Sequence, residues 1–113
     1  MAIRWAEIAQ VSEMTVKGNA KTPPYFKATL KESAPYVEFL HSNGESLRII
    51  FNFQPGDIVE ADCKKEKVYI NKELKMSAID LMKADFFYLK PGYNRIATIP
   101  AMDLETKYTE KWL

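Results

Sequence analysis

Short segments in which apolar and polar residues alternate recur about every ten residues along the chain, and most of them end in a turn signal. Alternation places successive side chains on opposite faces of an extended strand, so this spacing is typical of a sandwich or barrel. The sequence therefore predicts an all-β fold, an antiparallel β-sandwich with at most one short helix. The segments expected to be strands are 3–9, 14–17, 26–30, 37–41, 47–53, 58–62, 67–71, 86–89, 93–99 and 106–112.

Three turn signals mark reversals of the chain between these strands. The Asn43-Gly44 pair supplies the positive backbone angles that a tight hairpin turn requires. The tetrapeptides at 54–57 (Gln-Pro-Gly-Asp) and 90–93 (Lys-Pro-Gly-Tyr) place proline second and glycine third, as a type II turn demands. We therefore expect a hairpin across Asn43-Gly44 and a reversal at each Pro-Gly pair.

One segment, residues 76–84, has the pattern of a short helix. Ala78, Leu81 and Met82 are spaced three and four positions apart, as in the buried stripe of an amphipathic helix, and Asp80 and Lys83 fall outside the stripe. The pattern predicts a helix of one or two turns that places Leu81 and Met82 in the core.

Composition and charge indicate one soluble globular domain, residues 1–113. A chain of 113 residues with 47% apolar and 27% charged residues fits a single core. The net charge of +1 provides no global field to gather nucleic acid or anionic lipid. Arg4 and Glu7 interrupt the apolar run that a signal peptide would need, and no segment approaches the ~20 apolar residues that span a bilayer. We therefore expect synthesis in the cytoplasm without a signal peptide, and neither nucleic acid nor membrane as partner.

Few residues carry candidate chemistry. His41 is the only histidine and Cys63 the only cysteine, which excludes an internal disulfide and a Cys/His zinc set. His41 ends a predicted strand before a turn, where we expect an exposed or half-buried ring. Cys63 falls on the same face of the extended segment as Val59 and Ala61, which are expected to point inward, so we expect it in the core. The glycines are scattered among turns and form no phosphate loop. These patterns predict no catalytic residue, no metal site and no cofactor.

From Gly18 onward, several features follow one another in an order that resembles a known family. A Pro-Pro pair precedes the Asn-Gly hairpin, then Pro-Gly-Asp, a hairpin with Val-Glu-Ala-Asp, a Phe-x-x-Leu-x-Pro-Gly-x-Asn-x-Ile segment, and a closing Tyr-Thr-Glu-Lys-Trp-Leu. This series resembles the C-terminal domain of distal tail proteins from siphophages and prophages, phages with long, non-contractile tails. The matching residues are Phe86, Leu89, Pro91, Gly92, Asn94, Ile96 and Trp112. Independently of the resemblance, Asn94 can bond to backbone amides after its turn and fix the register of the next strand.

The resemblance implies a galectin-like β-sandwich, in agreement with the strand pattern. It also implies a non-enzymatic structural module at the virion tail tip, attached to baseplate or receptor-binding proteins. Full-length members of the family carry a preceding domain that forms a hexameric ring, and a chain of this length is too short to contain it. We therefore expect residues 1–17 to be a connecting segment or an extra strand, and this domain alone to be a monomer or a weak oligomer.

Functions from other classes remain open on the sequence. A tail docking module would use exposed aromatic or arginine anchors, for which the candidates are Trp5, Arg48, Tyr69 and Tyr93. The alternative is a carbohydrate-binding module for host cell-surface glycan, which the galectin-like fold suggests without any sugar-binding motif. A small hydrolase is the third alternative, and the sequence offers it no convergent nucleophile, base and oxyanion donor.

Overall fold

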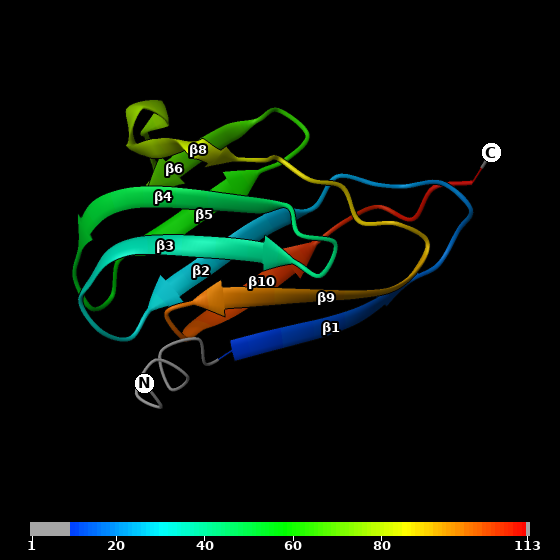
Figure 1. Ribbon diagram of the computed structural model, residues 1–113, viewed down its shortest axis with the longest axis horizontal. Coiled ribbons are helices and arrows are strands. Elements are labelled where there is room, and N and C mark those ends of the chain that lie inside the picture. The colour runs from blue at the N-terminus through cyan, green and yellow to red at the C-terminus, as the bar shows by residue number, and fades with distance from the viewer. Residues whose placement is uncertain (1–9, 113) are drawn as a thin grey trace.

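Two antiparallel sheets of five strands each face one another in the computed structural model, which describes residues 10–112 (Figure 1). The strand order is β1-β9-β3-β4-β8 in the first sheet and β10-β2-β5-β6-β7 in the second. The predicted antiparallel β-sandwich is confirmed. The strands are β1 (Gln10–Val16), β2 (Tyr25–Leu30), β3 (Ala34–His41), β4 (Ser46–Phe53), β5 (Ile58–Asp62), β6 (Lys67–Ile70), β7 (Glu73–Leu74), β8 (Ile79–Ala84), β9 (Gly92–Ile99) and β10 (Met102–Lys107).

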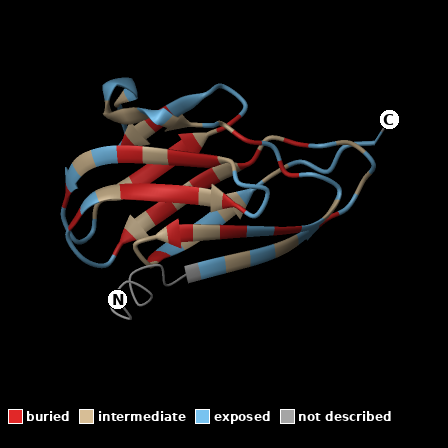
Figure 2. Cartoon of the chain, in the orientation of Figure 1, coloured by how far each residue is buried: buried red, intermediate tan, exposed pale blue. Residues whose placement is uncertain are grey.

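The core lies between the sheets and follows from the alternation of the strands. In β2, for example, Phe26, Ala28 and Leu30 are buried while the residues between them are half-exposed. Phe26 stacks on Phe39 of the facing sheet, with ring centroids 5.0 Å apart, and Phe87 packs at a tilt against Phe26 at 5.6 Å. Figure 2 shows the same alternation of buried and more exposed residues along strands of both sheets.

The predicted hairpins are present. β3 and β4 are joined across Asn43-Gly44, where the Gly44 N–H donates to the His41 carbonyl (2.9 Å). Gly44 has a φ of +99° and Asn43 has a negative φ, so the turn uses one positive angle instead of the expected two. At the first Pro-Gly pair the Asp57 N–H donates to the Gln54 carbonyl (3.1 Å), which closes the predicted reversal.

The helix predicted over residues 76–84 is wrong beyond its first turn. Met76–Ala78 forms a short 3₁₀ helix, η1, and β8 follows as an edge strand of the first sheet. Leu81 and Met82 were expected in the core, yet each is 89% exposed. On the edge of the sheet, Leu47 of β4 pairs with Ala84 of β8, and Ile49 pairs with Ile79. One β4 residue, Arg48, therefore lies opposite the four β8 residues 80–83. The extra residues bulge away from the sheet, and that bulge, not a helix, accounts for the spacing of the apolar residues.

Two strand predictions near the C-terminus are also corrected. Residues 86–89 form no strand, because they connect β8 at the sheet edge to β9; Phe87 and Leu89 nevertheless reach the core from this segment. The last strand is β10, not 106–112, and beyond it Lys111 makes only isolated bridges to Gly18 and Ala20. The predicted strand 3–9 lies outside the described residues. Within the segment 1–17, β1 is the described part and pairs with β9.

Candidate functional site

Asn94, the asparagine of the family-like motif, is fully buried and uses both polar atoms of its side chain. Its Oδ1 accepts the Lys90 N–H (3.1 Å) and lies 3.0 Å from His41 Nε2, and its Nδ2 donates to the carbonyls of Lys90 (2.8 Å) and Gly92 (3.1 Å). The predicted bonding of Asn94 to the backbone of the preceding turn is confirmed. These bonds tie the second Pro-Gly turn to the end of β3.

His41 is buried, which corrects the expectation of an exposed or half-buried ring. Its Nδ1 accepts the Asn43 N–H (3.1 Å), so Nε2 carries the proton that it donates to Asn94 Oδ1. The ring also packs at 5.3 Å from the Phe87 ring. Because both ring nitrogens already serve structural hydrogen bonds, His41 stabilises the hairpin, and no carboxylate within residues 10–112 is hydrogen-bonded to it as the orienting group of a base would be.

Cys63 is a core residue, as predicted, and burial raises the pKa of its thiol to about 12. Residues 10–112 contain no group of three or more His, Cys, Asp or Glu side chains placed to bind a metal ion. None of the helices in the same range is long and apolar enough to cross a membrane.

The other motif residues divide between core and surface. Leu89 and Ile96 are buried, and Phe86 packs partly buried against the core. Pro91 is exposed, and Gly92 has the positive φ (+95°) expected of its turn position. Trp112 is 71% exposed. Most of the motif therefore builds the scaffold, while its last residue lies on the surface.

Leu81 and Met82 are adjacent on β8 and are the most exposed large hydrophobic residues among those that the structure describes, and we call this pair the β8 knob. A network of charged residues braces its base. Arg48 donates from Nε (3.0 Å) and Nη2 (2.9 Å) to Glu38 Oε1, and its Nη1 lies 3.8 Å from Asp80 Oδ2. Lys83 Nζ lies 3.7 Å from Glu38 Oε2, and Asp80 Oδ1 accepts the Met82 N–H (3.0 Å). The residues that flank the knob are thus fastened to β3 and β4.

Glu38 and Arg48 form the centre of this network. The Glu38 residue is only 3% exposed although it lies on the outer face of the sheet, because the network covers it. The hydrogen bonds to Glu38 raise the pKa of Arg48 above its ordinary value, and the Arg48 guanidinium also lies over the Tyr36 ring at 4.5 Å. A guanidinium held by a carboxylate and an aromatic ring has little freedom to move, so it is a rigid support for β8.

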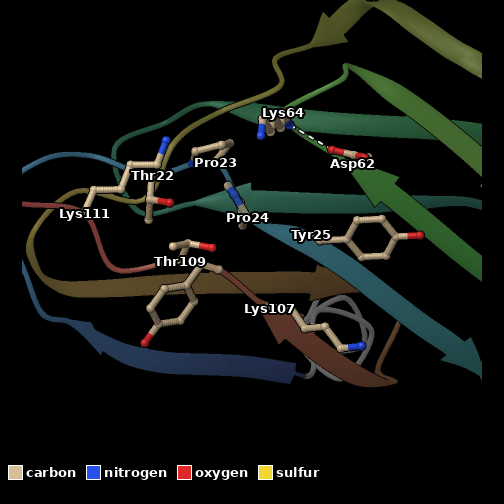
Figure 3. A pocket seen from close by; sticks show the side chains of 10 residues that line it. Thr22, Pro23, Pro24, Tyr25, Asp62, Lys64, Lys107, Thr109 and Lys111 are labelled. Atoms are coloured by element: carbon tan, nitrogen blue, oxygen red, sulfur yellow. Dashed lines mark hydrogen bonds between the residues drawn. The ribbon is translucent and has the colours of Figure 1, made fainter.

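The outer face of the second sheet carries a groove around Tyr25, which we call the Tyr25 groove. It consists of three adjoining cavities of about 460, 270 and 280 Å³ that all include Tyr25. Figure 3 shows side chains that line the cavity of about 270 Å³, among them Lys64, Lys107 and Lys111 from three different segments of the chain. The residues that line the groove are Thr22, Pro23, Pro24, Tyr25, Lys27, Glu60, Asp62, Lys64, Lys65, Tyr69, Lys72, Glu105, Lys107, Tyr108, Thr109 and Lys111.

Tyr25 and Glu60 meet at the floor of the groove. The Tyr25 hydroxyl donates to Glu60 Oε2 (2.9 Å), and Lys72 Nζ lies 3.7 Å from Glu60 Oε1. Burial, together with the hydrogen bond to Glu60, raises the pKa of Tyr25 to about 12. The hydroxyl therefore stays protonated at neutral pH and serves as a fixed donor.

The residues predicted as interface anchors do not form one patch. Arg48 supports the β8 knob on the first sheet, and Tyr69 lies beside Glu60 on the second, at the border of the Tyr25 groove. Tyr93 is exposed on β9, where its hydroxyl donates to Glu13 (2.6 Å) and that bond raises its pKa. Trp5 lies outside the described residues. The role of these residues as anchors stays a prediction.

Sequence reasoning missed the residues that dominate both surfaces. It placed Leu81 and Met82 in the core because their spacing fits a helix. Tyr25 was not among the predicted interface anchors, although one signal for it was available. Tyr25 is out of phase with the inward residues Phe26 and Ala28, which places its ring on the outer face of β2.

Comparisons with known proteins agree with this fold. The profile of the siphovirus-type tail component, C-terminal domain, matches residues 17–112. The crystal structure of the SPP1 Dit (gp 19.1) protein, described as a paradigm of the hub adsorption apparatus in phages that infect Gram-positive bacteria, is similar with a TM-score of 0.71 and 19% sequence identity. The alignment covers 88% of this chain and 43% of SPP1 Dit, so the chain spans less than half the length of that protein. A search of curated proteins found no match.

The matched range includes all seven motif residues and the whole of β2 to β10. The galectin-like sandwich expected from the resemblance is confirmed, and the comparisons favour the structural tail role over the carbohydrate-binding alternative. The chain belongs to the family of siphovirus-type tail components and corresponds to their C-terminal domain.

Proposed function

We propose that this domain is a non-catalytic attachment module at the phage tail tip, which holds baseplate or receptor-binding proteins by docking. The β8 knob carries the proposal, because Leu81 and Met82 are each 89% exposed on a surface that is otherwise rich in charged residues. Burial of a large apolar side chain contributes about 1.5–3 kcal/mol. Two adjacent side chains of this kind are therefore suited to anchor a protein interface.

The bracing of the knob favours docking by insertion of side chains. The ion pairs among Arg48, Glu38, Asp80 and Lys83 hold the residues on either side of the knob, so the backbone of the bulge loses little conformational freedom when the knob binds. Asp80 also accepts the Met82 N–H, which removes one backbone donor from the exposed edge. A bulged edge with an occupied donor is poorly suited to adding a strand from another protein.

The chemistry of the described residues supports a mechanical role. The His41 ring has both nitrogens in hydrogen bonds to the hairpin, and the thiol of Cys63 has a pKa of about 12, far above neutral pH. The description of SPP1 Dit as part of a hub adsorption apparatus supports placing the domain at the tail tip.

The test is binding to the tail proteins encoded beside this chain in the same phage genome, measured by biolayer interferometry with the full chain. We expect one of them to bind, and L81S/M82S to weaken that binding by at least about tenfold, equivalent to 1.4 kcal/mol. The matched control is V11S, which alters an exposed apolar residue on β1 at the opposite edge of the same sheet.

The variants separate docking from folding. Because Leu81 and Met82 are exposed, L81S/M82S should keep its free energy of unfolding within about 0.5 kcal/mol of the original chain. Absence of binding to every neighbouring tail protein, or equal binding by L81S/M82S and V11S, would overturn the proposal.

A further inference from the structure

The Tyr25 groove concentrates positive charge on a chain that is nearly neutral. Six lysines and three carboxylates line it, a local formal charge of +3, whereas the whole chain carries +1. The lysines come from β2, β10, the β5–β6 turn, the residues after β6 and the C-terminal segment. They are Lys27, Lys64, Lys65, Lys72, Lys107 and Lys111. The fold therefore gathers side chains that are far apart in sequence into one basic surface.

Two of the three carboxylates in the groove are already engaged. Asp62 Oδ1 accepts the N–H groups of Lys64 and Lys65, both at 3.0 Å. Glu60 accepts the Tyr25 hydroxyl and pairs with Lys72. The other five lysines make no ion pair with any described residue. Their ammonium groups are therefore available to carboxylates from outside.

We propose that the Tyr25 groove binds an extended, acidic segment of a partner protein. The basic charge supplies the complementarity, and the rings of Tyr25, Tyr108 and the half-buried Pro23 supply apolar contact for the side chains between the acidic residues. This inference deepens the proposed docking role and rests on it, because it names the chemistry of a second contact on a different sheet.

The arrangement of charges favours a polypeptide over a uniform polyanion such as a phosphate polymer. The strand register places Glu105, Lys27 and Glu60 side by side, so a continuous run of phosphates would meet carboxylates between the lysines. The arginines Arg48 and Arg95, whose planar donors suit phosphate, lie on the other sheet. A peptide can space its acidic residues to match the lysines.

The test is fluorescence anisotropy of the full chain with a labelled peptide that alternates glutamate with tyrosine and glycine. The same peptide with glutamine for glutamate is the ligand control. We expect saturable binding of the glutamate peptide, weakened at least about tenfold when salt rises from about 50 to about 300 mM. K65E and K107E should each weaken binding several-fold. K90E changes the net charge equally at an exposed lysine outside the groove, and should leave binding unchanged.

Each remaining outcome counts against the inference. Equal binding of the glutamine peptide, or equal loss in K107E and K90E, would show that the groove does not select an acidic segment. Tighter binding of poly(glycerol phosphate) than of the peptide, lost in K107E, would assign the groove to a polyanion instead. The β8 knob lies outside the groove, so L81S/M82S should bind the peptide normally, and failure of this inference is distinguishable from failure of the docking role.

Discussion

Asn94 organises a loop whose path the hydrophobic pattern leaves undefined. Its side chain joins the turn at Lys90, the glycine at 92 and the His41 ring through four contacts of 2.8–3.1 Å. Replacing this buried amide costs free energy, because each of its partners would be left without a hydrogen bond at a site that water does not reach. The residue thereby couples the segment that enters β9 to the hairpin between β3 and β4.

We predict that N94A lowers the free energy of unfolding by about 2–3 kcal/mol, since it leaves several buried donors and acceptors unpaired. Urea denaturation followed by tyrosine and tryptophan fluorescence measures this change. N52A, at an exposed asparagine of β4, is the matched control and should stay within about 0.5 kcal/mol. A loss in N94A no larger than in N52A would contradict the structural role of Asn94.

For individual residues, the sequence predicts the surroundings that arise from neighbours along the chain and not those that arise from distant contacts. The alternation of side chains along a strand is enough to place Arg48 and Tyr69 on outer faces and Cys63 in the core, because these assignments depend only on neighbours in sequence. The buried His41 ring is hydrogen-bonded to Asn94, 53 residues away, and no local pattern of the sequence contains that contact.

At the level of elements, local turn chemistry was predictable and long-range pairing was not. The β3–β4 hairpin formed where expected because Asn43-Gly44 reverses the chain by itself. β8 was mistaken for a helix because its bulge arises from pairing with β4 at only two positions, which the spacing of apolar residues cannot reveal. The knob thus lies where the local sequence pattern, which favours a helix, disagrees with the tertiary structure, which forms a strand. Such disagreements are common at functional sites.

The C-terminal segment offers a prediction at this scale, because Gly18 holds it in place. Lys111 bridges Gly18, and its carbonyl accepts the Asn19 N–H (2.9 Å) and the Ala20 N–H (3.3 Å). Gly18 has a φ of +103°, and a Cβ there would collide with the Lys111 carbonyl oxygen. We expect G18A to destabilise the chain and to speed amide hydrogen exchange over residues 109–112, of which Thr109 and Lys111 line one end of the Tyr25 groove.

Gly44 provides the control for this prediction. It has a similar φ of +99°, but a Cβ there would meet nothing within 4 Å. G44A should therefore carry the backbone cost alone, about 1 kcal/mol. G18A should exceed it by at least about 1 kcal/mol, since the carbonyl must also shift. Equal costs in urea denaturation would mean that the close approach to Lys111 contributes nothing.

The whole molecule presents its two candidate surfaces on different sheets. The β8 knob is on an edge strand of the first sheet, and the Tyr25 groove is on the outer face of the second, with β10, β2, β5 and β6 beneath it. No residue of the knob or of its bracing network lines the groove. Such an arrangement allows one domain to hold two partners, or one partner at two places.

The effect of substitutions on the binding free energy distinguishes a partner that contacts both surfaces from one that contacts only the knob. If the surfaces act independently, the losses caused by L81S/M82S and by K107E should add within about 0.5 kcal/mol when the partner tail protein contacts both, because the sites share no residue. If the partner contacts the knob alone, K107E should leave its affinity unchanged while the acidic peptide still binds the groove. The measurement is a double-mutant cycle by biolayer interferometry on the full chain. A coupling free energy above about 1 kcal/mol would contradict independence and would mean that the two sheets respond as one interface.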